Sequence, residues 1–159
     1  MWWYTTRTMN ILITYMTNAG GTYLMARTIR DVLNKKHTVT LKKATEVSAQ
    51  DIPLYDVLVI GSPSWNVNGK EGQPHEAILD LLEDLRRGKN VKKLRTATFG
   101  SGDSSYTNFC GAVDIISEAL KQMGTSSVHS PLKVDELYFH LDKNLNDVER
   151  WTKQLMKAF

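Results

Sequence analysis

Short apolar runs of strand length alternate along this chain with apolar residues at helical spacing, and this alternation restricts the fold more than any other feature. Residues 11–15 and 57–60 are almost entirely apolar, which is typical of parallel strands buried on both faces. Residues 95–99 form a third short run that ends before a glycine. Residues 37–43 alternate apolar and polar side chains and predict a more exposed strand, and residues 126–134 predict a fifth strand of mixed character.

Four amphipathic segments lie between and after these strands. Their apolar residues recur every three to four positions, which is the period of a helix with one buried face. The predicted helices are marked by residues 22–36, 78–85, 109–123 and 145–159. With a short link at 44–54, the element order β-α-β-β-α-β-α-β-α indicates an α/β protein, in which a parallel sheet carries helices on both faces.

The chain length of 159 residues corresponds to one domain, which we expect to span residues 9–159. Residues 1–8 contain three adjacent aromatic side chains and show neither a helical nor a strand period. We expect them to be a disordered extension ahead of an alternative start at Met9. An aromatic arm that binds a partner is the other interpretation of this segment.

The composition excludes several classes of site and partner. The single cysteine, Cys110, rules out an internal disulfide framework and a multi-cysteine metal centre, and it suits a reducing cytoplasm. A net charge of +3 gives no argument for nucleic-acid binding. No apolar run approaches the ~20 residues that a membrane-spanning helix needs. We therefore expect a cytoplasmic protein with no metal, no nucleic-acid partner and no membrane partner.

Ligands of an open parallel sheet bind outside the carboxyl ends of its strands, where the loops 16–22, 61–69 and 100–108 are predicted to lie. The first loop has the composition of an anion cradle. Its two glycines let the backbone approach a ligand closely, and the N–H groups of the following helix point towards an anion. The loop matches neither G-x-x-x-x-G-K-[ST] nor G-x-G-x-x-G, so one terminal phosphate monoester suits it best. A tight turn capped by threonine is the alternative.

The second and third loops each carry an aromatic side chain among polar residues. Trp65 lies in the loop after the strand at 57–60, and Tyr106 lies in the loop after the strand at 95–99. Two aromatic rings on neighbouring loops can enclose a flat ring, and each stack contributes about 0.5–1.5 kcal/mol beyond its buried area. The alternative is that each ring packs against its own loop. Combined with the anion cradle, the two aromatics indicate a flat, phosphorylated cofactor.

These features together resemble the flavodoxin family. Residues 15–22 resemble its phosphate-loop signature, and Ser64-Trp65-Asn66 resembles its first flavin-stacking loop. Residues 99–114 resemble its second flavin loop and are the most specific match. The resemblance covers residues 9–159 and is to the short-chain type, because the fifth strand lacks an insertion. It implies a flavodoxin-like fold: a five-stranded parallel sheet of order 2-1-3-4-5 in a doubly wound three-layer sandwich.

The resemblance also implies one tightly held, non-covalent FMN. Residues 17–22 would hold its phosphate, Trp65 and Tyr106 would cover the two faces of its isoalloxazine ring, and backbone groups of residues 101–103 would bond its pyrimidine edge. The cofactor-binding residues that the resemblance implies are Thr17, Asn18, Ala19, Gly20, Gly21, Thr22, Ser62, Pro63, Ser64, Trp65, Asn66, Ser101, Gly102, Asp103, Tyr106, Phe109 and Cys110.

A family member of this kind carries one electron at a time, at low potential, between reductases and oxidoreductase partners. We therefore expect a monomer that binds redox proteins transiently and has no catalytic residues of its own. The nearest alternatives are an FMN-dependent quinone or NAD(P)H reductase of the same fold, and a flavoprotein dedicated to activating one radical enzyme. Hydride transfer from NAD(P)H would distinguish a reductase from an electron carrier.

Two further classes receive less support from the residues. Gly102-Asp103-Ser104 resembles the nucleophile block of GDS-type hydrolases, but Asp135 and His140 are five positions apart where that class has three. A regulatory receiver of similar topology needs clustered acidic residues after its first strand and a phosphoacceptor aspartate after its third. This chain has Thr17-Asn18 and Ser62-Pro63-Ser64 at those places.

Overall fold

The computed structural model describes residues 7–88 and 90–159, so most of the predicted extension at 1–8 lies outside the described residues. The strands are β1 (Asn10–Tyr15), β2 (Thr38–Lys43), β3 (Val57–Gly61), β4 (Trp65–Val67), β5 (Lys70–Gln73), β6 (Arg95–Gly102), β7 (Ser126–Ser127) and β8 (Leu132–Asp135). The α-helices are α1 (Gly21–Leu33), α2 (Glu76–Gly88), α3 (Gly111–Gln122) and α4 (Leu141–Met156), and the 3-10 turns are η1 (Ala44–Glu46), η2 (Ile52–Leu54) and η3 (Leu137–His140).

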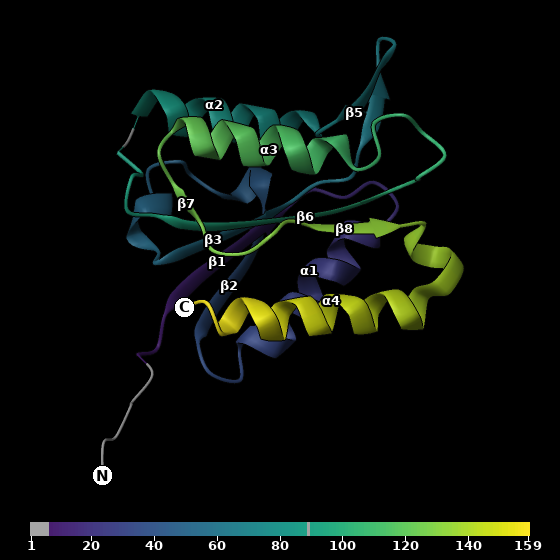
Figure 1. Cartoon of the computed structure of the whole chain (residues 1–159). Coiled ribbons are helices and arrows are strands. Elements are labelled where there is room, and N and C mark those ends of the chain that lie inside the picture. Colours follow the sequence, from purple (N-terminus) through teal and green to yellow (C-terminus); the bar gives the residue numbers. More distant parts are fainter. Residues whose placement is uncertain (1–6, 89) are drawn as a thin grey trace.

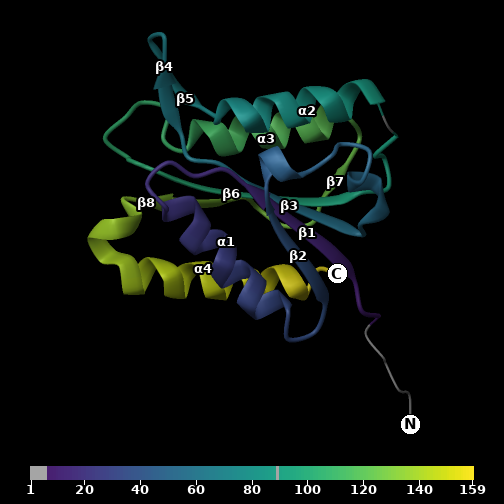
Figure 2. The ribbon, with the colours of Figure 1, turned by 180° about the vertical axis from the view of Figure 1, so that it is seen from behind.

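The central sheet is parallel and has the order β2-β1-β3-β6, with β7 and β8 both paired to the outer side of β6. Helices α1 and α4 cover one face of the sheet, and α2 and α3 cover the other (Figure 1). Figure 2 shows the same three layers from behind. With β7 and β8 occupying one strand position, the order is 2-1-3-4-5, and the predicted α/β fold is confirmed.

Two apolar cores hold the layers together, one on each face of the sheet. Successive side chains of a strand point to opposite faces. Ile11 and Ile13 of β1 accordingly pack in the core under α1 and α4, and Leu12 packs in the core under α2 and α3. All three are at most 1% exposed. Full burial of one such side chain stabilises the fold by roughly 1.5–3 kcal/mol, so the central strands form a rigid support for the loops at their carboxyl ends.

The fifth strand differs from its prediction, because it is interrupted rather than continuous over 126–134. β7 pairs with the first residues of β6, and β8 pairs with its last residues. Residues 128–131 between them are not in a strand, and this segment contains Pro131, which has no N–H to donate to a ladder. The interruption leaves the strand order unchanged.

An antiparallel hairpin formed by β4 and β5 begins inside the loop expected at 61–69 and extends beyond it to Gln73. Asn68 and Gly69 at its tip have φ angles of 51° and 81°, as a two-residue type I′ turn requires. An Asn-Gly pair is the strongest short sequence signal for a hairpin. The sequence therefore contained the signal for this turn, although the strands on either side of the Asn-Gly pair are too short to show an apolar alternation.

Helix boundaries differ from the predictions by a few residues. Helix α3 begins at Gly111 rather than 109, because Cys110 has a left-handed backbone with φ of 51°. Helix α1 ends at Leu33, and α4 extends from Leu141 to Met156 rather than covering 145–159. Within residues 7–88 and 90–159, no helix combines the length and the apolar character needed to cross a membrane.

Candidate functional site

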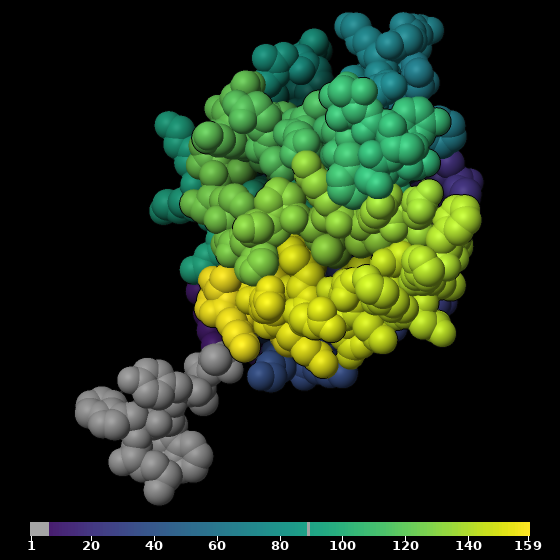
Figure 3. Space-filling model, turned by 45° about the vertical axis from the view of Figure 1, so that its right-hand side comes forward, coloured from purple at the N-terminus to yellow at the C-terminus, as the bar shows by residue number. Residues whose placement is uncertain are grey.

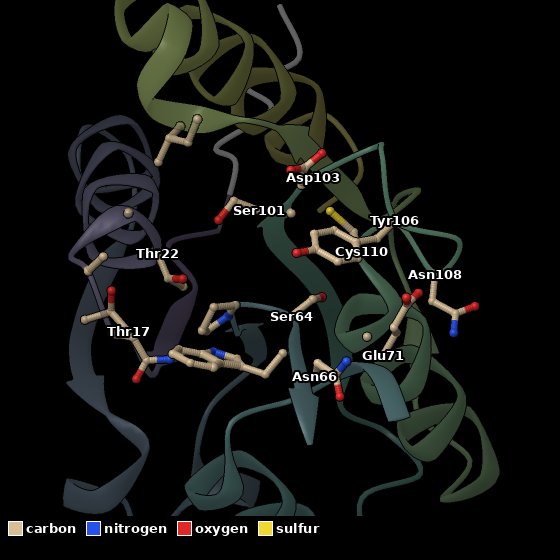
Figure 4. Close-up of a pocket in the computed structure, with 18 of the residues that line it drawn as sticks. Thr17, Thr22, Ser64, Asn66, Glu71, Ser101, Asp103, Tyr106, Asn108 and Cys110 are labelled. Atoms are coloured by element: carbon tan, nitrogen blue, oxygen red, sulfur yellow. The ribbon is translucent and has the colours of Figure 1, made fainter. Parts of the chain in front are cut away.

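A cavity of about 410 Å³ opens where the carboxyl ends of β1, β3 and β6 meet. Figure 4 shows Thr17 and Thr22 on one side of it and Tyr106 and Asn108 on the other. Its lining residues are Thr17, Asn18, Ala19, Gly21, Thr22, Pro63, Ser64, Trp65, Asn66, Glu71, Gly72, Ser101, Gly102, Asp103, Tyr106, Asn108, Cys110, Leu137 and Tyr138. All three loops predicted to carry the chemistry therefore contribute to one site.

Residues 17–22, which we call the glycine loop, join β1 to α1 by a turn that requires glycine. Gly20 has a left-handed backbone with φ of 89°, and its N–H donates to Thr17 Oγ1 at 3.0 Å. A side chain at this φ would be strained. The turn brings the first N–H groups of α1 to the cavity, where they have no acceptor inside the helix.

Thr22 carries the most informative polar atom of the glycine loop. Its side chain is 1% exposed and lines the cavity, and its Oγ1 has no hydrogen-bond partner. An unpartnered buried hydroxyl costs about 1–3 kcal/mol, so a ligand that offers this hydroxyl an acceptor would remove that cost on binding. The hydroxyl lies in the first turn of α1, whose N-terminus carries roughly half a positive charge. This part of the cavity can therefore bind an anion although no Lys or Arg lines it.

The hairpin β4–β5 is fixed to the start of α3 by close contact between two glycines. A Cβ atom at Gly111 would lie 2.8 Å from the carbonyl oxygen of Gly72, and one at Gly72 would lie 3.0 Å from the Cα of Gly111. The hydroxyl of Ser64 adds a second connection, because its Oγ accepts the N–H of Ala112 at 3.1 Å. The second and third loops are thus joined through α3.

Two aromatic side chains on these loops line the cavity while keeping much of their surface open. Trp65 at the start of β4 is 44% exposed, and Tyr106 in the loop after β6 is 55% exposed. Isolated aromatic rings with this exposure leave apolar area that a ligand would cover. The two rings provide apolar walls that a flat aromatic ligand can contact.

Hydrogen bonds within the third loop fix the position of Asp103. Hydrogen bonds from the side chain and the N–H of Ser105 hold the pKa of the Asp103 carboxyl below its ordinary value. Ser104 donates its hydroxyl and its N–H to Asp135 at the end of β8. The loop is therefore held to β8, and Asp103 keeps its negative charge beside the cavity.

Glu71 is the other charged side chain that lines the cavity, and its Oε2 is buried without a hydrogen-bond partner. The charged lining therefore consists of two carboxylates, Glu71 and Asp103, and no Lys or Arg is among the lining residues. Added negative charge is disfavoured near two carboxylates.

Cys110 lies at the floor of the cavity and is chemically quiet. It is 1% exposed, and burial raises the pKa of its thiol to about 12. A thiol with this pKa is protonated at neutral pH and is a poor nucleophile. The Cys110 side chain therefore provides shape rather than reactivity.

The hydrolase interpretation receives no support from the geometry, because the hydroxyl of Ser104 is bonded to Asp135 and not to a histidine. Among the residues that the structure describes, no cluster of three or more His, Cys, Asp or Glu side chains is placed to hold a metal ion.

The structure places the predicted cofactor-binding residues around the cavity, with three exceptions. Gly20, Ser62 and Phe109 do not line it. Gly20 shapes the turn of the glycine loop. Ser62 is fully buried, and its hydroxyl donates to the carbonyl of Pro63 and accepts the N–H of His75. The side chain therefore joins the two ends of the segment between β3 and α2.

Five lining residues were missing from the predicted set: Glu71, Gly72, Asn108, Leu137 and Tyr138. Glu71 and Gly72 come from β5, which was not predicted as a strand. Leu137 and Tyr138 follow β8, whose carboxyl end lies at the same edge of the sheet as the other three. Because ligands of such sheets bind at the carboxyl ends of the strands, the segment that follows the last strand carried the signal for these two residues.

Comparisons with known proteins agree with this geometry. The sequence profile of the flavodoxin family matches residues 13–146. The flavodoxin of Nitratidesulfovibrio vulgaris (strain DSM 19637 / Miyazaki F) is 38% identical over 128 residues, which cover 79% of this chain and 84% of that protein. The flavodoxin of Maridesulfovibrio salexigens is 36% identical over 126 residues, which cover 78% of this chain and 84% of that protein. The crystal structure of oxidised flavodoxin 2 from Bacillus cereus superposes with a TM-score of 0.83 at 26% identity, over 94% of this chain and 99% of that one.

Proposed function

This chain belongs to the flavodoxin family of FMN-binding electron carriers, and from that premise we propose that it shuttles single electrons at low potential between a reductase and an oxidoreductase partner. Flavodoxins are electron-transfer proteins rather than enzymes, so we assign no residue a catalytic role. When bound, FMN supplies the redox chemistry, because it accepts and releases electrons one at a time. The residues of this chain would bind it, limit its contact with water and set its potential.

The observation that carries the proposal is the unpartnered hydroxyl of Thr22 at the N-terminus of α1. A phosphate monoester supplies the acceptor that this hydroxyl lacks, together with acceptors for the free N–H groups of the first helical turn. We assign phosphate binding to Thr17, Asn18, Ala19, Gly21 and Thr22, all of which line the cavity. In this assignment Gly20 and Ser62 act indirectly, by shaping the loops.

The remaining lining residues suit the flavin ring of the same cofactor. In the proposal, Trp65 and Tyr106 contact the ring through their exposed faces, and residues 101–103 bond its polar edge. Cys110 and Gly72 form the floor and one wall without offering a reactive group. Phe109 does not line the cavity, so we assign it no direct contact with the ring.

The low potential follows from the two carboxylates of the lining. Glu71 and Asp103 disfavour each negative charge that reduction adds to a bound flavin, and the cavity lining contains no Lys or Arg to offset them. Electron transfer to a partner requires the cofactor to remain near the surface. Trp65 and Tyr106 are partly exposed, so a cofactor that contacts them can remain near the surface. We further propose that this carrier is cytoplasmic and monomeric and that it binds redox proteins transiently.

Stepwise anaerobic reduction of the purified protein, followed in the visible spectrum, tests the proposed function. We expect one FMN per chain, two separate one-electron steps, and rapid reduction only when a partner reductase is added. Direct bleaching by NAD(P)H in a single two-electron step would instead favour the FMN reductase alternative. A chain that neither contains nor takes up FMN would contradict both readings.

A further inference from the structure

We propose that Tyr138 is a positioning residue of the phosphate site, which acts by fixing one peptide plane of the glycine loop from the opposite end of the sequence. This inference rests on the proposed function and deepens it. Tyr138 lies in η3, after the last strand, and its ring lines the cavity. It is half-exposed, and the function assigned above gives it no role.

A single contact links the two segments. The hydroxyl of Tyr138 donates to the carbonyl oxygen of Ala19 at 2.6 Å, across 119 positions of sequence. The N–H of the same peptide unit belongs to Gly20 and donates to Thr17 Oγ1 at 3.0 Å. Because C=O and N–H of a trans peptide point in opposite directions, these two hydrogen bonds hold the plane from both sides. The Ala19 carbonyl is thereby directed to Tyr138 rather than towards an anion, which it would repel.

The glycines of the loop allow the tyrosine to lie this close. A Cβ at Gly20 would lie 3.3 Å from the Tyr138 hydroxyl, and a Cβ at Gly21 would lie 3.1 Å from Leu137 Cδ2 and 3.5 Å from the Tyr138 ring. Gly21 has no need of a positive φ, so its lack of a side chain is best explained by this contact. The loop and the segment that contains Tyr138 are packed as one unit.

The backbone that carries Tyr138 is itself well fixed. The side-chain amide of Asn144, which is 7% exposed, donates to the carbonyl of Leu137 at 3.1 Å. The N–H of Glu136 donates to the carbonyl of Gly102 in the third loop at 2.8 Å. Figure 3 shows this yellow-green segment at the rim of the molecule, beside purple atoms from the start of the chain. Tyr138 is therefore a rigid support rather than a surface side chain that happens to reach the loop.

The placement of this contact predicts a selective effect. Tyr138 fixes the glycine loop, which binds the phosphate, whereas the flavin ring is assigned to the hairpin and the third loop. Loss of the hydroxyl should therefore weaken binding of FMN but not of riboflavin, which has the same ring and no phosphate. A merely structural role would weaken the binding of both ligands.

The test compares dissociation constants of FMN and riboflavin for the apoprotein and for Tyr138→Phe, measured by quenching of flavin fluorescence. We expect the Kd of FMN to rise about fivefold, because holding the released Ala19 peptide in its binding orientation should cost about as much as one hydrogen bond, with the Kd of riboflavin unchanged. Phe139→Leu is the matched control, because the neighbouring Phe139 side chain is 77% exposed and does not line the cavity. We expect the control to bind both ligands as the parent does.

A double-mutant cycle gives a second readout. If Tyr138 and Thr17 hold the same peptide plane, the losses of FMN affinity in Tyr138→Phe and Thr17→Val will not add in the double variant. An unchanged Kd of FMN in Tyr138→Phe, equal weakening of both ligands, or full additivity would overturn the inference while leaving the proposed function intact. Failure of the parent chain to bind FMN at all would overturn the proposed function and this inference with it.

Discussion

The glycine loop and the hairpin β4–β5 form parts of the same cavity but are held in place by different means. Hydrogen bonds fix the glycine loop, from Gly20 to Thr17 within the loop and from Tyr138 to Ala19 across the chain. The hairpin is fixed by steric fit, because Gly72 and Gly111 allow its backbone to meet the start of α3. The first arrangement orients polar groups, and the second sets the spacing of two walls.

The two regions also differ in charge and exposure. The glycine loop has no ionisable side chain and holds the buried hydroxyl of Thr22. The hairpin and the third loop bring two carboxylates and two half-exposed aromatic rings to the cavity. A neutral loop suits a group whose charge never changes, such as a phosphate. An acidic, partly open region suits a group whose charge changes with its redox state. The glycine loop therefore suits the phosphate of the proposed cofactor, and the hairpin and third loop suit its redox-active ring.

The largest difference between the two regions is expected in Thr22→Val. Removing the hydroxyl loses one hydrogen bond to a charged group, so the Kd of FMN should rise by about 10- to 100-fold, while riboflavin binding should change little. The apoprotein should meanwhile become more stable by about 1 kcal/mol, because an unpartnered buried hydroxyl is removed. Fluorescence titration and urea unfolding of the apoprotein measure the two effects.

Thr14→Val is the matched control for that experiment. Thr14 Oγ1 is also buried without a partner, but Thr14 lies in β1 and does not line the cavity. We expect Thr14→Val to stabilise the apoprotein in the same way and to leave FMN affinity unchanged. Equal losses of FMN affinity in both variants would mean that the Thr22 hydroxyl has no ligand role.

The fold was predictable because its central strands leave few choices. The runs at 57–60 and 11–15 are too apolar to lie anywhere but in a buried sheet, and the helical periods between them require crossovers. The glycine loop was predictable for a similar reason, since glycines between a buried strand and an amphipathic helix have few other uses. In these regions local pattern and tertiary structure agree.

The parts that were missed depend on contacts between segments far apart in the sequence. Nothing local to Tyr138 shows that its hydroxyl reaches Ala19, and nothing local to Gly72 shows that Gly111 faces it. The interruption of the fifth strand likewise depends on the pairing of β6 with two short partners. Sequence periods report which face of an element is buried, but they do not report which neighbour covers it.

A smaller effect, this time on the hairpin, is expected from Gly111→Ala. The added Cβ would lie 2.8 Å from the Gly72 carbonyl oxygen, so the hairpin must shift away from α3, at a cost of about 1–3 kcal/mol. This shift separates the walls of the cavity that are assigned to the flavin ring. FMN and riboflavin should therefore both bind about tenfold more weakly. Fluorescence titration of the apoprotein with each ligand measures this.

Gly88→Ala provides the control for steric fit. Gly88 ends α2, and no atom lies within 4 Å of the position of an added Cβ. We expect no loss of affinity for either ligand and a small gain in helix stability. If Gly111→Ala weakened FMN but not riboflavin, the hairpin would contribute to the phosphate site and the division between the regions would fail.

The smallest effect is expected from Glu71→Gln, which removes a charge and keeps the shape of the side chain. If the carboxylates set the potential, its loss should raise the midpoint potential of the second one-electron step by about 40 mV, equivalent to about 1 kcal/mol. FMN affinity in the oxidised protein should change little, because glutamine keeps the shape of this wall and the oxidised flavin ring carries no charge. Asp80→Asn, on the exposed surface of α2, removes the same charge away from the cavity and should leave the potential within measurement error. Spectroelectrochemical titration measures the potential of each variant. Equal shifts in the two variants would show that net charge, and not the position of Glu71, sets the potential. A shift confined to Glu71→Gln would show that the acidic wall acts at short range.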